Sequence, residues 1–432
     1  MIRNSKAATW DWGLIITYFS IATVFLGSPL VRLDVGFFQL YPLRLFGFIG
    51  FFLILSRVGW GDPFLELYYK FSVFFLLLGL VSVIWAPDTN LAIKEFGVLQ
   101  TGITLTWLVV RYINTEGRVN TALNIWIVGA LFINGIGLYE IFTQKYLISV
   151  EVGGKNERLA ERLGSLAPKA IFYNQNNFAF FDSLTALVLF GRLIKQYRPL
   201  KWYVLNWLSF VISLYVLICC YSRAAIASVG LGFALFFIFS LFSHNHYKKN
   251  LVKIFAGLLV LIICLLIINP SIIDAIVTKF NLVVQKNETA SSSNDTRLDL
   301  YTTSIDYALD HLGFGMGPNS SVFPLDGLPP HNFFLQILME YGIVILIGIL
   351  YFLIVAVKKL GLYQNVIGNA LPAMFKASII VFPIMAVGPS TIIVEGSFWL
   401  WYALVIAYSS IMHRKSQMLF QAAKQKELTV TR

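Results

Sequence analysis

The sequence predicts an all-α fold, a polytopic membrane bundle of about twelve transmembrane helices that forms one integral membrane domain over residues 1–432. Three observations support this prediction. The 432-residue chain is 57% hydrophobic and only 13% charged, with a mean hydropathy of +0.73, whereas about a quarter of the residues in a typical soluble domain are charged. Apolar stretches long enough to cross a hydrocarbon core of about 30 Å recur along the chain. Lys and Arg gather in alternate connections between these stretches.

The predicted spans follow from the apolar stretches, taken in order. They are residues 13–30, 37–56, 69–86, 96–113, 119–142, 178–194, 202–222, 224–243, 251–269, 333–357, 371–390 and 396–412. A cytoplasmic N-terminus places most Lys and Arg residues on one face, as the positive-inside rule requires, and the even number of spans returns the C-terminus to the cytoplasm. The net charge of +11 is explained by this topology, and no basic stretch interleaved with aromatic residues indicates nucleic-acid binding.

The connections indicate on which side of the membrane a reaction could occur. Those on the cytoplasmic face are too short for a nucleotide-binding domain. The two long ones are outside: residues 143–177, and an extracytoplasmic loop over residues 270–332 before the tenth span. ATP and nucleotide sugars are not readily supplied there, so an outer-face transferase needs a donor already carried through the bilayer. A lipid-linked diphosphate meets this demand, and arginine recognises phosphate oxygens at two points.

Three arginines could bind such a donor, and each has a structural alternative. Arg223 lies in a nearly loopless hairpin between two spans, where it could instead be an interfacial anchor. Arg297 lies outside the membrane and could instead form a salt bridge with Asp295 or Asp299. Arg44 falls inside a span, where a buried cation needs either a wet donor pocket or a structural ion pair.

The candidate catalytic residue is His331. It follows two prolines and stands where the span at Phe333 begins, so its imidazole is expected at the mouth of the bundle. A neutral ring there could take a proton from an acceptor hydroxyl, although a histidine that only caps a helix is the alternative. The next residue, Asn332, would cap the helix or orient the ring.

Further polar residues could join the same substrate site. Glu340 points into its span, where it could contribute to the site or pair with Arg44. Asn176 lies in an Asn-rich turn before the sixth span and could bind substrate, although such a turn equally suits a helix cap. Glu395 lies in an outer loop and could line the same cavity.

The stretch Gly313-Phe314-Gly315-Met316-Gly317 invites comparison with a phosphate-binding loop. The Lys and the Ser or Thr that complete such a loop do not follow, and no strand and helix flank it, so a tight turn is the better interpretation. No cluster of His and carboxylate residues on the outer face has metal-ligand spacing, so we predict no metal, and the sequence indicates no other cofactor.

Together these motifs resemble the bacterial O-antigen ligase and polymerase superfamily. The resemblance rests on Ser222-Arg223, Thr296-Arg297-Leu298, the glycine series 313–317, and His331-Asn332 followed by Gly342. It is strongest over residues 170–345. It implies a helix bundle in the bacterial cytoplasmic (inner) membrane that transfers or polymerises a glycan at the outer face. The donor would be a polyprenyl-diphosphate-linked oligosaccharide, and the reaction would invert the anomeric carbon without a metal.

The resemblance also implies roles for individual residues. Arg223 and Arg297 match the arginines that hold the donor diphosphate, and His331 matches the histidine proposed to activate the acceptor. Ile345 stands where ligases favour Gly, Thr or Tyr, which favours a polymerase while leaving a ligase open. The acceptor could be a glycan, a lipid or a protein, because the superfamily also contains protein O-oligosaccharyltransferases.

A membrane transporter of a solute or a lipid-linked glycan is the alternative class. Transporters usually place ionisable residues near the middle of the bilayer. Here the candidate residues gather outside the membrane, with the exceptions of Arg44 and Glu340.

Overall fold

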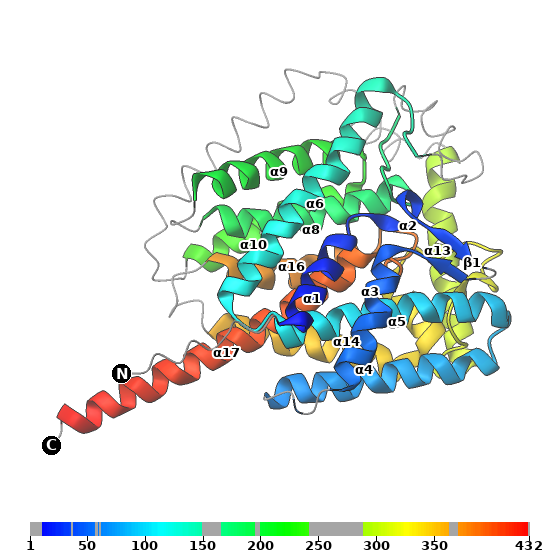
Figure 1. Ribbon diagram of the computed structural model, residues 1–432. Helices are drawn as coiled ribbons and strands as arrows, with labels where there is room; N and C mark the ends of the chain where they lie inside the picture. The colour runs from blue at the N-terminus through cyan, green and yellow to red at the C-terminus, as the bar shows by residue number, and fades with distance from the viewer. Residues whose placement is uncertain are drawn as a thin grey trace.

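The computed structural model describes residues 11–35, 38–56, 59, 62–148, 166–194, 199–241, 288–362 and 370–430. Most of the described helices run roughly alongside one another, and one helix, α13, crosses one end of the bundle (Figure 1). The elements are α1 (Trp12–Thr23), α2 (Gly27–Leu30), β1 (Leu33–Val35), β2 (Phe38–Leu40), α3 (Pro42–Leu55), α4 (Pro63–Val81), η1 (Ser82–Ile84), α5 (Thr89–Tyr112), α6 (Glu116–Thr143), α8 (Gln175–Leu193), α9 (Leu200–Cys219), α10 (Arg223–Leu241), α13 (Glu288–Asp310), η2 (Ser320–Val322), α14 (Phe333–Leu362), α16 (Ala370–Met385) and α17 (Gly396–Val430).

The helical membrane character of the chain is confirmed. Five helical segments of the described chain are long and apolar enough to cross a membrane: Pro63–Ile84, Glu116–Thr143, Leu200–Cys219, Arg223–Ser240 and Phe333–Gly361. The other predicted spans fall on shorter or more polar helices, except for the span at 251–269, which lies outside the described residues. The protein is therefore a multi-pass membrane protein, whereas the number of twelve crossings stays a prediction.

One predicted boundary was wrong. The second span was predicted to begin at residue 37, but the structure places the antiparallel hairpin β1–β2 there, and α3 begins only at Pro42. Proline favours the first turn of a helix, because its missing N–H has no partner there in any case. The last predicted span, residues 396–412, lies within α17, which continues to Val430, and the polar C-terminal part of this helix extends beyond the bundle (Figure 1).

The core of the bundle is built around α8. Every residue of α8 from Asn177 to Leu193 is buried, because α9, α16 and α10 pack against it. A helix enclosed on all sides needs no polar face, and α8 accordingly carries little amphipathic pattern. Helix α17 packs along α5 and α14 and completes this core.

The predicted loop over residues 270–332 is in part helical. Helix α13 occupies residues 288–310, and the short helix η2 follows it. A separate hydrophobic cluster of Leu300, Leu325 and Met339 packs α13 and the segment after it against α14. This small core holds a mostly polar helix across the end of the bundle (Figure 1).

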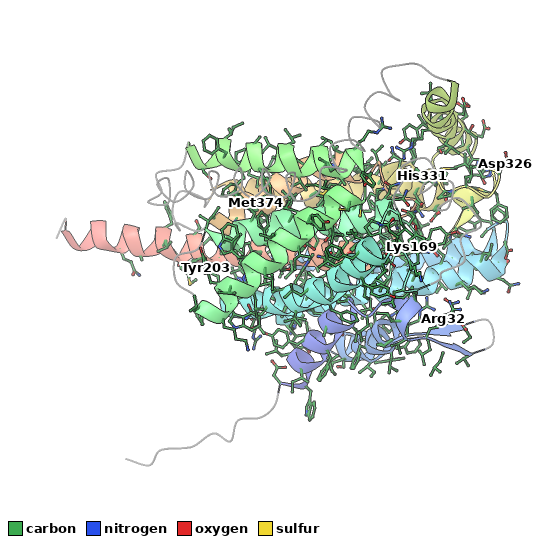
Figure 2. The ribbon with its side chains drawn as sticks, turned by 90° about the horizontal axis from the view of Figure 1, so that it is seen from above. Arg32, Lys169, Tyr203, Asp326, His331 and Met374 are labelled. Carbon is green, nitrogen blue, oxygen red and sulfur yellow. The ribbon has the colours of Figure 1, made fainter. Side chains whose placement is uncertain are left out.

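The bundle has two chemically different ends, which we call the α13 end and the tail end. Figure 2 shows Arg32, Lys169, Asp326 and His331 towards the α13 end, whereas Tyr203 and Met374 lie towards the other. The tail end is where α1 begins and α17 leaves the bundle (Figure 1). Several of the basic residues predicted to be cytoplasmic meet at the tail end, where they line a cavity of about 350 Å³: Arg111, Arg118 and Arg414. This grouping agrees with the predicted topology.

Candidate functional site

The glycine series at 313–317 joins a break in α14. Gly342 lies inside α14 with φ 83° and ψ 175°, so the helix is interrupted after its first turns. The N–H of Ile343, just after the break, donates to the carbonyl of Gly313 at 2.8 Å. Before the break, the carbonyls of Met339 and Glu340 accept from the glycine segment at 2.9 Å each. The loop therefore satisfies the backbone groups that the interrupted membrane helix leaves without intrahelical partners.

This junction leaves no room for side chains. A Cβ atom added to Gly315 would lie 2.6 Å from the backbone oxygen of Glu340, and one added to Gly342 would lie 2.4 Å from the oxygen of Gly313. Gly315 and Gly342 both adopt positive φ, which costs other residues free energy. Gly313 ends a turn, as predicted for this stretch, whereas residues 314–317 form an irregular segment in close backbone contact with α14.

Glu340 is fully buried beside this junction. Its Oε1 accepts hydrogen bonds from Ser321 Oγ at 2.6 Å and from Gln336 Nε2 at 3.2 Å. The carboxylate therefore ties η2 to the first segment of α14. A contribution of Glu340 to substrate binding stays a prediction.

A buried polar network continues from Glu340 across the bundle. Gln336 Oε1 accepts from Thr391 Oγ1 at 2.9 Å, and the carbonyl of Thr391 accepts from Asn177 Nδ2 at 3.0 Å. Asn177 Nδ2 also donates to Glu395 Oε1 at 2.6 Å. Thr391 and Glu395 belong to the segment between α16 and α17, residues 386–395, which we call the connecting loop.

The Asn-rich turn before α8 is a helix cap. Asn174 Oδ1 accepts from the N–H groups of Asn176 at 2.9 Å and of Asn177 at 3.0 Å, and Asn174 Nδ2 donates to Ser390 Oγ of the connecting loop. Asn176, the predicted substrate ligand, is half-buried, and its backbone N–H takes part in this cap.

His331 lies directly before α14 at the α13 end (Figure 2). It is half-buried and has φ 49°, a left-handed conformation that is unfavourable for a side chain other than glycine. Its carbonyl lies 3.5 Å from the hydroxyl of Tyr301 on α13. Asn332 caps α14, because its Oδ1 accepts from the N–H groups of Phe334 at 3.0 Å and Leu335 at 3.3 Å. Of the two roles expected for Asn332, the structure shows the helix cap.

Arg297 lies on α13, one turn before Tyr301, and is half-buried. Burial raises the pKa of the Tyr301 hydroxyl, and the nearby charge of Arg297 partly offsets that rise. Because Tyr301 also reaches His331, these contacts place Arg297 and His331 in one neighbourhood. Within the part of the chain that the structure describes, Arg297 and Asp299 form no ion pair.

Arg223 is the first residue of α10 and is exposed. Only residues 220–222 separate α9 from α10, so the predicted short hairpin is confirmed. The connecting loop contacts this hairpin, because a Cβ atom at Gly388 would lie 3.6 Å from Ser222 Oγ. The same loop contacts the start of α14, where the N–H of Phe333 donates to the carbonyl of Ala386 at 3.2 Å. Arg223, Arg297 and His331 therefore lie at one end of the bundle, around the connecting loop and the junction of α13 with α14.

Arg44 lies in the first turn of α3, which follows the β-hairpin. It is 3% exposed, and its guanidinium donates to the carbonyls of Gln39 at 2.7 Å and Lys94 at 3.4 Å. It also lies over the ring of Tyr41, 5.1 Å from the centroid. These contacts connect the β-hairpin to α5, and a role of Arg44 in donor binding stays a prediction.

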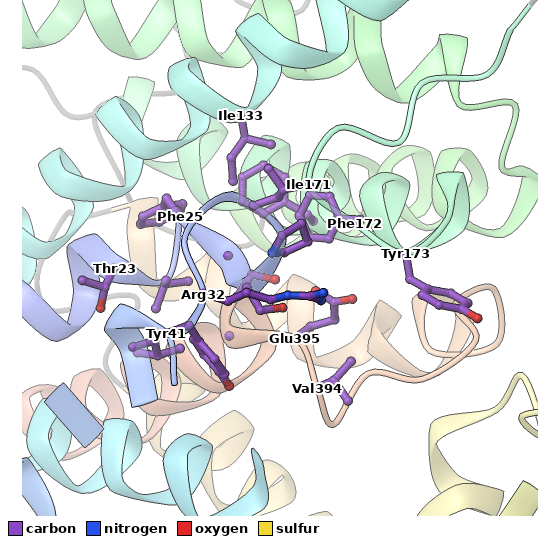
Figure 3. A pocket seen from close by; sticks show the side chains of 18 of the residues that line it. Thr23, Phe25, Arg32, Tyr41, Ile133, Ile171, Phe172, Tyr173, Val394 and Glu395 are labelled. Atoms are coloured by element: carbon purple, nitrogen blue, oxygen red, sulfur yellow. The ribbon is translucent and has the colours of Figure 1, made fainter. Parts of the chain in front are cut away.

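A cavity of about 700 Å³ opens at the α13 end. Glu395 lines it together with residues from the end of α1, from α2 and from the segment just before α8 (Figure 3). Arg223, Arg297 and His331 are not part of its lining. From the sequence, Glu395 could have lined one cavity with these three residues. In the structure it lines this separate cavity instead.

Sequence reasoning missed Ser321, Gln336 and Thr391, which build the buried network together with Asn177 of the Asn-rich turn. One signal was available for Gln336. Two polar residues four positions apart in an otherwise apolar helix face the same side, so Gln336 and Glu340 could have been predicted to act together. The partner Thr391 carried no comparable signal.

Comparison with known proteins bears on the family that the chain resembles. A family model described as O-Antigen ligase matches residues 208–350, a range that contains Arg223, Arg297 and His331. The teichuronic acid biosynthesis protein TuaE of Bacillus subtilis (strain 168) is 25% identical over 439 residues, covering 94% of this chain and 86% of that protein. The resemblance to the O-antigen ligase superfamily is therefore confirmed.

Proposed function

We propose that this protein is a membrane glycosyltransferase that builds a surface polysaccharide. It transfers or polymerises a polyprenyl-diphosphate-linked glycan onto an acceptor hydroxyl at the outer face of the bacterial cytoplasmic membrane. The observation that carries this proposal is the position of Arg223, Arg297 and His331. They come from three distant segments, lie at the same end of the bundle, and all fall within the range that matches the O-antigen ligase family.

The proposed chemistry assigns separate tasks to these residues. Arg223 and Arg297 bind the diphosphate and stabilise the negative charge that grows on it as the bond between sugar and phosphate breaks. His331 takes the proton of the acceptor hydroxyl, whose oxygen forms the new bond to the anomeric carbon while the diphosphate leaves with the electron pair of the broken bond. Attack opposite the leaving group inverts the anomeric carbon. Because diphosphate is a good leaving group, this route does not demand a metal.

The topology supports a reaction on the outer face. In the proposed orientation both termini are cytoplasmic and the tail end, where basic residues gather, faces the cytoplasm. The α13 end then faces outward, where a lipid-linked donor that has crossed the bilayer can reach the arginines. Between the two products, a polymer is slightly favoured over a single ligation by Ile345. Protein O-glycosylation would use the same chemistry with a different acceptor.

The test is reconstitution of the purified protein in liposomes with a defined polyprenyl-diphosphate oligosaccharide. We expect products that lengthen in a ladder for a polymerase and a single shifted acceptor for a ligase. Replacing Arg223, Arg297 or His331 with Ala should lower the transfer rate at least about a hundredfold, because each removes a group that acts on the transition state. Arg118→Ala at the tail end is the matched control and should keep wild-type activity. Full activity in all three variants would refute the assignment, and flipping of the lipid without any transfer would indicate a transporter.

A further inference from the structure

The cavity of about 700 Å³ at the α13 end has no part in the chemistry described above. Figure 3 shows Arg32, Tyr41 and Glu395 around its interior, with Tyr173 towards its edge. Its volume lies within the range of about 300 to 1,000 Å³ that is typical of small-molecule sites. We propose that this cavity is a glycan-binding subsite, which holds sugar residues of the acceptor chain beside the reaction centre; this inference rests on the proposed function.

The charges of the cavity do not suit the donor diphosphate. Among the described residues that line the cavity, Arg32 is the only basic one, and its Nε lies 3.5 Å from Asp34 Oδ2, so a neighbouring carboxylate offsets part of its charge. Glu395 adds a carboxylate to the lining. A diphosphate needs uncompensated cations, as at Arg223 and Arg297, whereas a ligand rich in hydroxyl groups does not.

The lining groups match the two sides of a sugar ring. The exposed ring of Tyr173 and the half-buried ring of Tyr41 offer flat apolar surfaces to the C–H faces of a sugar. Polar side chains that line the same cavity can form hydrogen bonds with the hydroxyl groups of the sugar: Thr23, Ser28, Ser397 and Glu395.

Glu395 is the main polar anchor in this subsite. It is 9% exposed, and its Oε1 accepts from Asn177 at 2.6 Å. Among the described residues, Oε2 has no hydrogen-bond partner, so it is available to accept from sugar hydroxyls. An acyl chain in the same place would leave this carboxylate desolvated and unpaired, which is unfavourable. The polar anchor therefore favours a sugar over a lipid tail.

The connecting loop joins the cavity to the proposed reaction centre. It begins at Ala386, which bonds the N–H of Phe333 two residues after His331, and it ends at Glu395 in the cavity wall. Thr391, in the middle of the loop, is bonded to α14 through Gln336. An acceptor whose reacting hydroxyl lies at His331 can therefore place its neighbouring sugars along this loop and in the cavity.

The test measures glycan binding separately from transfer. Purified protein in lipid nanodiscs is titrated with short oligosaccharides released from the surface polysaccharide of the producing cell, and binding is followed by saturation-transfer NMR. We expect Tyr173→Ala to weaken binding about tenfold, because it removes a stacking surface. Tyr173→Phe should bind like the wild type, because it keeps the ring. Tyr203→Ala, an equally drastic change at an exposed tyrosine of the tail end, is the matched control and should change nothing.

The transfer assay supplies a second readout. In Tyr173→Ala the acceptor concentration at half-maximal rate should rise about tenfold, while that of the donor stays the same. A rise for the donor alone, or wild-type glycan binding by both Tyr173→Ala and Glu395→Gln, would overturn the subsite. Bound lipid that is lost from these variants, with no glycan binding by the wild type, would overturn it in favour of a lipid site. Glycan binding that depends on Tyr173 in a protein without transfer activity would support the subsite and refute only the proposed function.

Discussion

The two ends of the bundle use polar residues in different ways. At the tail end, charges meet in partly exposed ion pairs: Arg118 with Asp11 at 3.6 Å and Lys415 with Glu116 at 2.6 Å. Such pairs contribute at most about 1 kcal/mol each. At the α13 end, Glu340 and Asn177 are fully buried and hydrogen-bonded, so that removing one partner leaves another buried group unsatisfied. The tail end therefore contains partly exposed ion pairs, whereas Glu340 and Asn177 at the α13 end depend on the exact fit of their hydrogen-bond partners.

The backbone differs between the two ends as well. The α13 end contains several residues with positive φ in close succession, namely Gly313, Gly315, Gly317 and Gly342, together with His331. The loop and the broken helix they form are held by backbone hydrogen bonds instead of ion pairs. If this difference is correct, substitutions at the α13 end should have large effects and those at the tail end small ones.

The largest effect is expected for Gly315→Ala. The new methyl group would lie 2.6 Å from the backbone of α14, and alanine at positive φ adds a penalty of about 1 to 2 kcal/mol. We expect a loss of more than about 3 kcal/mol in the free energy of unfolding, measured by thermal unfolding in nanodiscs, and loss of transfer. The control is Gly135→Ala in α6, where a Cβ atom meets nothing within 4 Å. If the Gly315→Ala protein unfolded at the same temperature as the Gly135→Ala control, the junction would not be rigid.

The next effect, a loss that can reach that of Gly315→Ala, is expected for Glu340→Leu. Ser321 and Gln336 would lose their shared acceptor, and two buried donors would then lack this partner at a cost of about 1 to 3 kcal/mol each. Ser321→Ala, which removes only one donor, should cost about 1 kcal/mol. Equal stability of Glu340→Leu and the wild type, by the same melting assay, would show that this network does not hold η2 on α14.

The pH dependence of glycan binding should report on Glu395. Burial raises the pKa of this carboxyl to about 7, against the model-peptide value of about 4.5. The ionised form, which accepts hydrogen bonds with both oxygens, therefore predominates only above pH 7. Wild-type binding should strengthen up to about tenfold from pH 6 to pH 8. Glu395→Gln carries no charge in this range and should bind with little pH dependence; an identical profile for both proteins would exclude Glu395 as the responsible group.

The smallest effect is expected for Lys415→Ala at the tail end. Its ion pair with Glu116 is partly exposed, with side-chain exposures of 39% and 27%. The loss should stay below about 1 kcal/mol and decrease as salt is added, because exposed charges are screened. Melting curves at low and high salt provide the measurement. A loss comparable to that of Glu340→Leu would contradict the distinction between the two ends.

The helices were predictable because their signal is local. Each apolar stretch that crosses the membrane must form its own backbone hydrogen bonds, so the helices around Phe64, Trp126 and Phe210 can be recognised from their own residues. The hairpin at 33–40 was missed, because its apolar residues continue directly into the next span. The helix α13 was missed as well, because its mostly polar sequence depends on packing against α14.

The candidate site was predictable only in its chemistry. Residue type and topology indicated Arg223, Arg297 and His331, since few polar groups lie on the outer side of such an apolar chain. Nothing in the local sequence indicated that Thr391 bonds Gln336 or that Glu395 lines a cavity separate from Arg223, Arg297 and His331, because these partners lie tens or hundreds of positions away.

By itself, the sequence determined that this is a helical membrane protein, how its charge is distributed along the chain, and which few residues can bind an anion or accept a proton. These properties depend on residue type and on transfer from water into lipid, which act over one helix at a time. Only the tertiary structure decided that a glycine loop completes the broken helix α14, that Asn332 and Asn174 serve as caps, and that a cavity lies at the far end of the connecting loop. Those features arise from contacts between distant segments, whose geometry is set by the packing of the whole bundle.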